Sequence, residues 1–235
     1  MQQFGKYGSF ANFRAAMDTA LSSHLAATPK SAAAQKYRIE HCRRVAKIGR
    51  RLAEAENMGA AEAAWLEIGC LLHDIGKWDA QIPVDHGRAG ALVVKDLLEK
   101  AQITTEEYPL AAQIIQGIAM HVDGQWNPRS DEGSDRNKAD QPYLYFSNSP
   151  TLLARVIGEC DDIDRYSVYR IHDTLRYVDF LAKSTAEQIS WIEEYLSHLE
   201  SIRAIPRHTP HTQQWWEENI DFQICFFQKL RAEIS

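Results

Sequence analysis

Apolar residues recur at intervals of three and four along most of this chain, and no segment shows the alternating β-branched pattern of a strand. This interval is the period of a helix that buries one of its faces. The first helical segment spans roughly residues 9–26, and others are predicted near 60–73, 86–100 and 106–122. The sequence therefore predicts an all-α fold, a compact bundle of several helices.

The C-terminal third carries its own helix start signals. Ser184-Thr185-Ala186-Glu187 has the form of a capping box, and Thr209-Pro210 is a typical start of a last helix. Residues 123–142, by contrast, are polar and offer almost nothing to bury. We therefore expect this stretch to be a long surface loop. Loops of such length are usually functional or mobile.

Charge and cysteine usage narrow the possible functions. The formal net charge is −6 and no stretch gathers Lys and Arg into a long block, which argues against a dedicated nucleic-acid surface. The four cysteines lie far apart without a C-x-x-C pair, as expected of a reduced protein. The first residues lack the apolar run of a signal peptide, and no run of about 18 apolar residues exists to span a bilayer. We expect a cytoplasmic protein without membrane contact.

Several polar side chains occupy the apolar faces of the predicted helices. They are His41, His73, Asp74, His86, His121, Asp161 and Asp164. A single inward histidine is usually a hydrogen-bonded core residue, but a carboxylate in a core is costly unless it is paired or bound to a cation. Imidazole and carboxylate are common ligands of Zn, Mn, Fe and related ions. Metal binding explains the whole set most simply.

The order of these residues along the chain follows the pattern H…HD…D. Its members are His41, His73, Asp74 and Asp161. Residues 71–77, Leu-Leu-His-Asp-Ile-Gly-Lys, resemble the central motif of the HD superfamily of metal-dependent phosphohydrolases, and residues 154–164 are similar to its closing aspartate helix. The resemblance covers about residues 37–170. We therefore expect a single domain over residues 1–235, with a helical extension over about 184–235.

The resemblance implies a ligand set. His41, His73, Asp74 and Asp161 would hold one metal ion. Some members of the superfamily carry two further histidines and a second ion bridged by the HD aspartate, and His86 and His121 stand where those histidines would be. We expect one or two divalent ions, drawn from Mn, Fe, Co, Ni, Mg and Zn. In the alternative interpretation, these last two histidines contact substrate phosphate or lie just outside the direct ligands of a single ion.

Other residues are candidates for catalysis and substrate binding. Asp74 and Lys77 are predicted to be catalytic, with Lys77 also clamping a phosphate oxygen, and Arg88 and Arg165 are further candidates for substrate contact. Asp164 follows Asp161 by one helical turn, and we expect it to orient a metal-bound histidine or to accept a proton. The alternative for each basic residue is a solvated surface charge.

The predicted function is hydrolysis of a small phosphorylated substrate, by default a nucleotide, through metal-activated water. The helical 5′-deoxynucleotidases of the superfamily carry a glutamate where this chain has Lys77, so their substrate is not transferred. Two alternatives stay open: a di-iron oxygenase similar to myo-inositol oxygenase, and a non-catalytic module that senses nucleotides. A homodimer through the aromatic C-terminal helix is a further possibility, after core packing.

Overall fold

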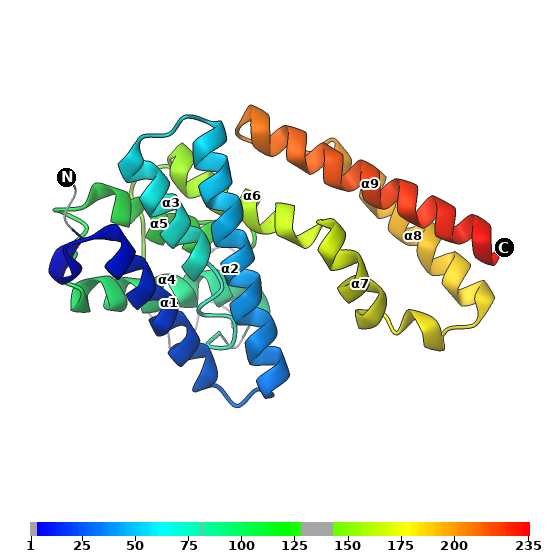
Figure 1. Ribbon diagram of the computed structural model, residues 1–235, viewed down its shortest axis with the longest axis horizontal. Helices are drawn as coiled ribbons and strands as arrows, with labels where there is room; N and C mark the ends of the chain where they lie inside the picture. The colour runs from blue at the N-terminus through cyan, green and yellow to red at the C-terminus, as the bar shows by residue number, and fades with distance from the viewer. Residues whose placement is uncertain (1–3, 81, 128–142) are drawn as a thin grey trace. The chain divides into compact units, whose positions relative to one another are not determined.

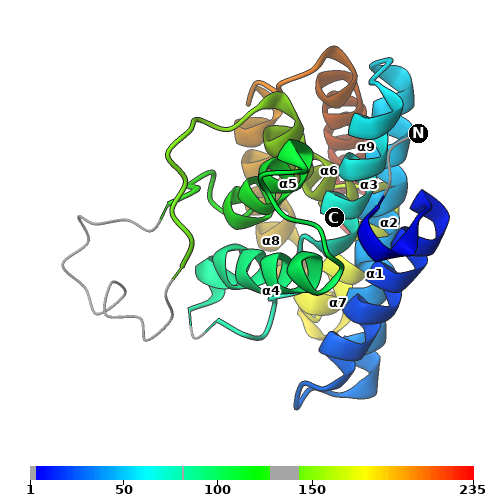
Figure 2. The ribbon, with the colours of Figure 1, turned by 90° about the vertical axis from the view of Figure 1, so that its left-hand side faces the viewer.

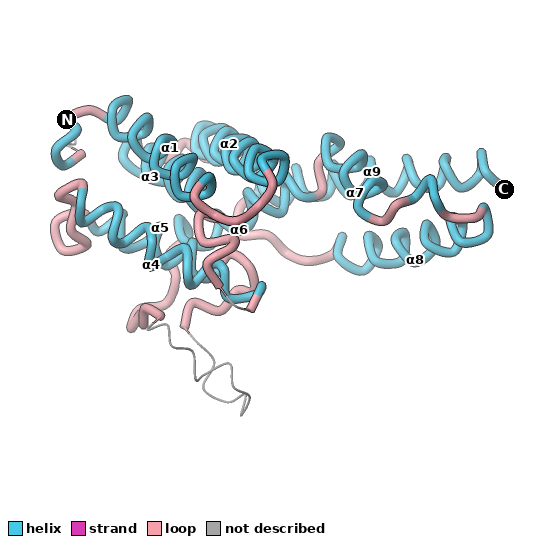
Figure 3. The backbone as a smooth tube through the Cα atoms, turned by 90° about the horizontal axis from the view of Figure 1, so that it is seen from below, coloured by secondary structure: helices cyan, strands magenta, loops and turns pink. Residues whose placement is uncertain are grey.

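The computed structural model describes residues 4–80, 82–127 and 143–235, and every regular element in these ranges is a helix (Figure 3). The α-helices are α1 Phe10–Ala26, α2 Ala32–Ala55, α3 Ala60–Leu72, α4 His86–Lys100, α5 Pro109–Met120, α6 Leu152–Arg165, α7 Val168–Tyr177, α8 Thr185–Arg203 and α9 Pro210–Ile234. Short 3-10 turns accompany them at Gly5–Tyr7 (η1), Pro83–Asp85 (η2) and Phe180–Ala182 (η4). The prediction of an all-α fold is confirmed.

The contacts divide the chain into two compact units, Met1–Asp161 and Asp162–Ser235. Helix α6, labelled in Figure 1, contains the boundary, so its first turns belong to the first unit and its last turn to the second. The single-domain interpretation stays a prediction.

The first unit is built from two helix pairs, α2 with α3 and α4 with α5, and contacts between α3 and α5 join the pairs. Helix α2 packs along α3, α4 packs along α5, and α1 contacts both α2 and α3. Figure 2 shows α4 and α5 side by side. Phe13, Trp65, Leu66, Leu72 and Ile118 are among the fully buried side chains of this unit. The apolar stripe of each helix therefore faces its neighbours, as its periodicity predicts.

Polar caps explain where the first helices begin. The Oγ of Ser9 accepts a hydrogen bond from the backbone N–H of Asn12 at the start of α1, and Ser31 does the same for Ala34 at the start of α2. Each cap satisfies one of the N–H groups that the first helical turn leaves without a partner. The predicted first helix agrees with α1 to within one residue at its start.

The second unit packs α7, α8 and α9 around its own apolar cluster. Phe180, Ile192, Leu199, Trp216 and Phe227 are buried in this cluster. The capping box at the start of α8 is present as predicted, because Ser184 accepts from Glu187 N and Glu187 accepts from Ser184 N. Trp216 and Phe227 serve core packing, the first of the two predicted roles for the aromatic residues of α9.

Three further expectations concern the loop over residues 123–142, membrane-spanning helices and the cysteines. The predicted surface loop over residues 123–142 is described only for its first five residues, which form turns and bends, and residues 128–142 lie outside the described ranges. Among the described helices none is both long enough and apolar enough to cross a membrane. Cys42, Cys70 and Cys160 are buried free thiols and Cys225 is an exposed one.

Candidate metal centre

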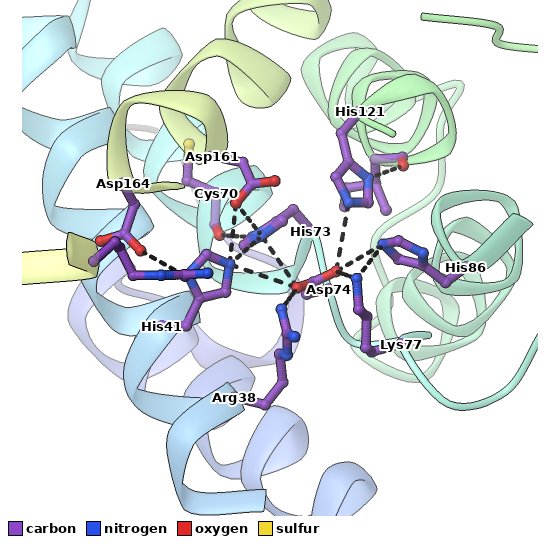
Figure 4. A network of polar contacts seen from close by, with 12 residues as sticks. Arg38, His41, Cys70, His73, Asp74, Lys77, His86, His121, Asp161 and Asp164 are labelled. Carbon is purple, nitrogen blue, oxygen red and sulfur yellow. Dashed lines mark hydrogen bonds and ion pairs between the residues drawn. The ribbon is translucent and has the colours of Figure 1, made fainter. Parts of the chain in front are cut away.

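The first unit brings the six predicted ligands together around the carboxylate of Asp74 (Figure 4). The residues come from five helices or helix ends: His41 from the middle of α2, His73 and Asp74 directly after α3, His86 from the first turn of α4, His121 directly after α5, and Asp161 from α6. Because distant parts of the chain supply them, only the packing of the helices makes this cluster.

One group of ligand atoms surrounds the Oδ2 atom of Asp74. The Nε2 atoms of His41 and His73 lie 3.5 Å and 3.7 Å from this oxygen. The Oδ1 atom of Asp161 is 3.0 Å from the Nε2 of His41 and 3.5 Å from that of His73. The two imidazole nitrogens are themselves only 3.1 Å apart. Four potential ligand atoms therefore converge on one small volume.

A second group surrounds the other oxygen of the same carboxylate. The Nε2 of His86 lies 2.9 Å from Asp74 Oδ1, and the Nε2 of His121 lies 3.5 Å from it. Figure 4 shows these two histidines on one side of Asp74 and His41 on the opposite side. The two oxygens of the Asp74 carboxylate thus face two different groups of ligand atoms.

The spacing of these atoms matches the ligand shell of a cation. With metal–nitrogen bonds of about 2.1 Å, two ligand atoms are about 3.0 Å apart at right angles and about 3.4 Å apart at the tetrahedral angle. The nitrogen and oxygen atoms of the first group are 3.0 to 3.7 Å apart. A hydrogen bond between the two Nε2 atoms would join only two of these atoms, whereas a cation placed among them would bind all four.

Backbone carbonyls fix the protonation of three imidazole rings. The Nδ1 atoms of His73, His86 and His121 each contact the carbonyl oxygen three residues earlier, those of Cys70, Pro83 and Ile118. A carbonyl only accepts, so each Nδ1 donates its proton to it. The Nε2 of a neutral ring then presents a lone pair toward Asp74. Such outer hydrogen bonds are typical of histidines that bind metal ions.

Electrostatics keeps the central carboxylates ionised. Burial opposes the charge of Asp74, but the positive charge of Arg38 outweighs it and holds the pKa of that carboxyl well below its usual range. Burial likewise opposes the charge of Asp161, whereas His73 and His41 hold its pKa well below the usual range. Both carboxylates are therefore in the form that binds a cation.

Two buried atoms of the cluster have no hydrogen bond in the described part of the chain. They are Asp74 Oδ1 and His121 Nε2. Both are ligand-type atoms on the side of Asp74 that faces His86. Leaving a buried polar atom without a hydrogen bond costs about 1–3 kcal/mol. A bound cation would satisfy both atoms, so the donor set fits a metal ion.

Glycines allow the helix ends to approach closely enough to form the second group. A Cβ atom at Gly76 would lie 2.2 Å from the backbone nitrogen of Gly90 and 2.7 Å from the carbonyl oxygen of His86. A Cβ at Gly87 would lie 2.7 Å from the carbonyl oxygen of Ile118. Only glycine permits these backbone contacts, which bring the start of α4 against the loop after Asp74 and the end of α5.

Two basic side chains flank the Asp74 carboxylate. The Nζ of Lys77 lies 3.7 Å from Asp74 Oδ1 and 3.1 Å from the Nε2 of His86, so this predicted residue is at the site. Arg38 donates from Nη1 to Asp74 Oδ2 and was not among the predicted residues. It precedes His41 by three residues on α2, and this helical spacing places it on the same face. That spacing is the sequence feature by which Arg38 could have been predicted.

Three predicted residues are not among the two groups of ligand atoms. Arg88 is buried and ion-paired with Asp85 and Asp123. Arg165 is an exposed residue at the end of α6, with its guanidinium 5.9 Å from the ring centre of Tyr166. Asp164 is buried in the second unit, where its Oδ2 is 3.5 Å from Arg170 Nη1. The predicted roles of Arg165 and Asp164 stay predictions.

Comparison with known proteins agrees with this ligand arrangement. The family model of the HD domain matches residues 38–166, which is more than half of the chain. No curated protein and no solved structure gave a match. The matched range begins at Arg38 and includes all six converging residues. The chain belongs to the HD domain family, and membership of that family implies a metal-dependent hydrolase.

Proposed function

We propose that this protein is a phosphohydrolase that uses two divalent cations and metal-activated water to cleave a nucleotide or another small phosphate ester. The observation that carries the proposal is the Asp74 carboxylate, whose two oxygens face two separate groups of ligand atoms. Family membership supports metal-dependent hydrolysis, and the ligand geometry supports two ions over one.

The ligands divide between the two sites through Asp74. His41, His73, Asp74 and Asp161 would hold one ion, and Asp74, His86 and His121 the other. Bound cations lower the pKa of coordinated water and offset the charge that builds on phosphoryl oxygens. Asp74 contributes a charge to both sites. Because its carboxyl is ionised, it has no proton to lose before it binds the cations.

Arg38 and Lys77 supply positive charge for the substrate. Lys77 is part-exposed, and its ammonium group lies beside His86 and Asp74 Oδ1, where it can donate to a phosphate oxygen. Arg38 lies beside Asp74 Oδ2, and its planar guanidinium suits two oxygens of one phosphate group. A phosphorylated substrate would thus meet one positively charged side chain next to each oxygen of Asp74.

A substrate screen with matched aspartate variants tests the proposal. The protein is purified without chelator, its metals are measured by mass spectrometry, and release of phosphate or pyrophosphate from nucleotides and sugar phosphates is followed with Mn²⁺ or Co²⁺ under anaerobic conditions. We expect turnover that Asp74→Asn abolishes. Asp18→Asn is the matched control, because Asp18 also pairs with an arginine of α2, Arg43, outside the cluster.

Two outcomes would contradict the proposal in different ways. Oxygen consumption by iron-loaded protein, without anaerobic phosphate release, would favour an oxygenase. If nucleotides raised the melting temperature while no ester was cleaved with any of the metals, the protein would be a sensing module.

A further inference from the structure

Arg88 occupies an unusual environment for an arginine. The residue is only 4% exposed, in the first turn of α4. Its Nη1 donates to Asp85 Oδ1 at 2.9 Å, and its Nη2 donates to Asp123 Oδ2 at 2.9 Å and to the carbonyl oxygen of Gln125 at 3.2 Å. A guanidinium keeps its charge when buried, so these acceptors are needed to offset the loss of hydration.

The two carboxylates that bind Arg88 are next to two of the predicted metal ligands in the sequence. Asp85 immediately precedes His86, and Asp123 follows His121 by two residues. Asp123 also accepts a hydrogen bond from the backbone N–H of Gln125 at 3.0 Å, which closes the turn after His121. The guanidinium therefore joins the two chain segments that present the second ligand group.

This connection matters because both histidines lie at helix ends. His86 is the first residue of α4, and His121 directly follows α5, whereas His41 lies within α2, which packs along α3. Backbone at a helix end has fewer hydrogen bonds to hold it than backbone within a helix. The carbonyl that orients the His86 ring belongs to Pro83, in the 3-10 turn that also contains Asp85.

We propose that Arg88 is a positioning residue that sets the relative placement of His86 and His121 and thereby controls binding of the second cation. The inference rests on the two-cation site of the proposed function. It replaces the expected substrate contact of Arg88, since both Nη atoms are bound to acceptors inside the protein. It predicts that loss of Arg88 affects the two cation sites unequally.

Manganese titration of the full chain tests this inference without measuring activity. Binding of Mn²⁺ is followed by isothermal titration calorimetry, and spin coupling between two ions by electron paramagnetic resonance. We expect the unmodified protein to bind two ions with a coupled spectrum. In Arg88→Met, the second ion should bind about 10–100-fold more weakly, the usual effect of removing a partner that orients a ligand, and the coupled signal should be lost. The first ion should bind as before.

Two further variants separate positioning from general destabilisation. Arg14→Met removes the ion pair of Arg14 with buried Glu67, whose atoms are 2.9 Å apart, and also leaves a buried carboxylate without its arginine. This control should still bind two ions. Asp123→Asn keeps the pair of Arg88 with Asp85 and the hydrogen bond to the carbonyl of Gln125, and it removes only the ion pair with the segment of His121. It should weaken the second ion and carries the test if Arg88→Met does not fold.

The possible failures are distinguishable. If Arg88→Met and Asp123→Asn bind both ions with unchanged affinity, or lose both ions equally, the inference about Arg88 is wrong and the proposed function stands. If the unmodified protein binds a single ion, the two-cation site itself is wrong, and the inference is overturned with it.

Discussion

The Nε2 atoms of His41 and His73 lie 3.1 Å apart, although the residues come from different helix segments and both side chains are almost completely buried. The proton of His73 is directed to the carbonyl of Cys70 through Nδ1, so its Nε2 offers a lone pair toward the ring of His41. In the same cluster, Asp74 Oδ1 and His121 Nε2 have no hydrogen bond within the described residues. Metal binding should therefore be coupled to stability.

Metal loading should raise the melting temperature. At a free metal concentration of about 100 times Kd, binding stabilises the folded protein by about 2.7 kcal/mol. For a chain of this size that corresponds to a shift of about 5–10 °C. The measurement is differential scanning calorimetry of protein treated with chelator and then reloaded with Mn²⁺ or Co²⁺. Asp74→Asn should show no such shift, and equal melting temperatures of the loaded and metal-free protein would contradict a built metal site.

Replacement of Lys77 should separate substrate binding from metal binding. Lys77→Met removes a positive charge 3.7 Å from Asp74 Oδ1, so cations should bind as well or better. Removal of one donor to the charged substrate should lower kcat/KM by about 100-fold. Steady-state kinetics and metal titration of the same preparation check both effects. Weaker metal binding in this variant would show that Lys77 supports the ligands rather than the substrate.

A methyl group at Gly76 should disturb the approach of α4. The added Cβ would lie 2.2 Å from Gly90 N, which is backbone and cannot move aside, so Gly76→Ala should destabilise the protein by about 1–3 kcal/mol. Gly59→Ala is the control, because its Cβ would meet only the side-chain oxygen of Glu62 at 3.4 Å. Urea denaturation of metal-free protein measures both. Equal stability of the two variants would mean that the contact of Gly76 with Gly90 is not tight in solution.

The pair of His24 and Asp79 should make stability depend on pH. The Nε2 of His24 lies 2.6 Å from Asp79 Oδ2, and this hydrogen bond raises the pKa of His24 although burial opposes the charge. The group therefore contributes stability below its unfolded pKa of about 6.5, and the contribution is lost as pH rises through the higher folded value. Both side chains are about one-third exposed, so the effect should stay below about 1 kcal/mol.

The measurement for this pair is the difference in unfolding free energy between the unmodified protein and His24→Gln. The difference should be larger at pH 5.5 than at pH 8.5. A difference that is the same at both pH values would show that the ion pair adds nothing to stability.

Much of this arrangement could be predicted from local patterns. The segment over residues 9–26 and the caps at Ser184 and Thr209 predict helices, because period and capping depend only on residues within a few positions. The short motifs at residues 71–77 and 154–164 resemble those of a metal-binding family, and they too are local. The position of Arg38 at the site could also have been predicted, since it precedes His41 by one helical turn. A single arginine on a helix, however, has many ordinary explanations.

The ion pairs of Arg88 could not be predicted from local patterns. Its place two residues after His86 predicts a substrate contact, and the structure pairs its guanidinium with Asp123, 35 residues away. No spacing rule links these two residues, because the link depends on how α4 and α5 meet.

The sequence by itself determined the helices, the family and the chemical types of the ligands. Tertiary structure alone decided that the two oxygens of one buried carboxylate face different groups of histidines. The physical reason is that helix formation is governed by neighbours in the chain, whereas the meeting of helix ends is governed by close backbone packing at glycines such as Gly76 and Gly87.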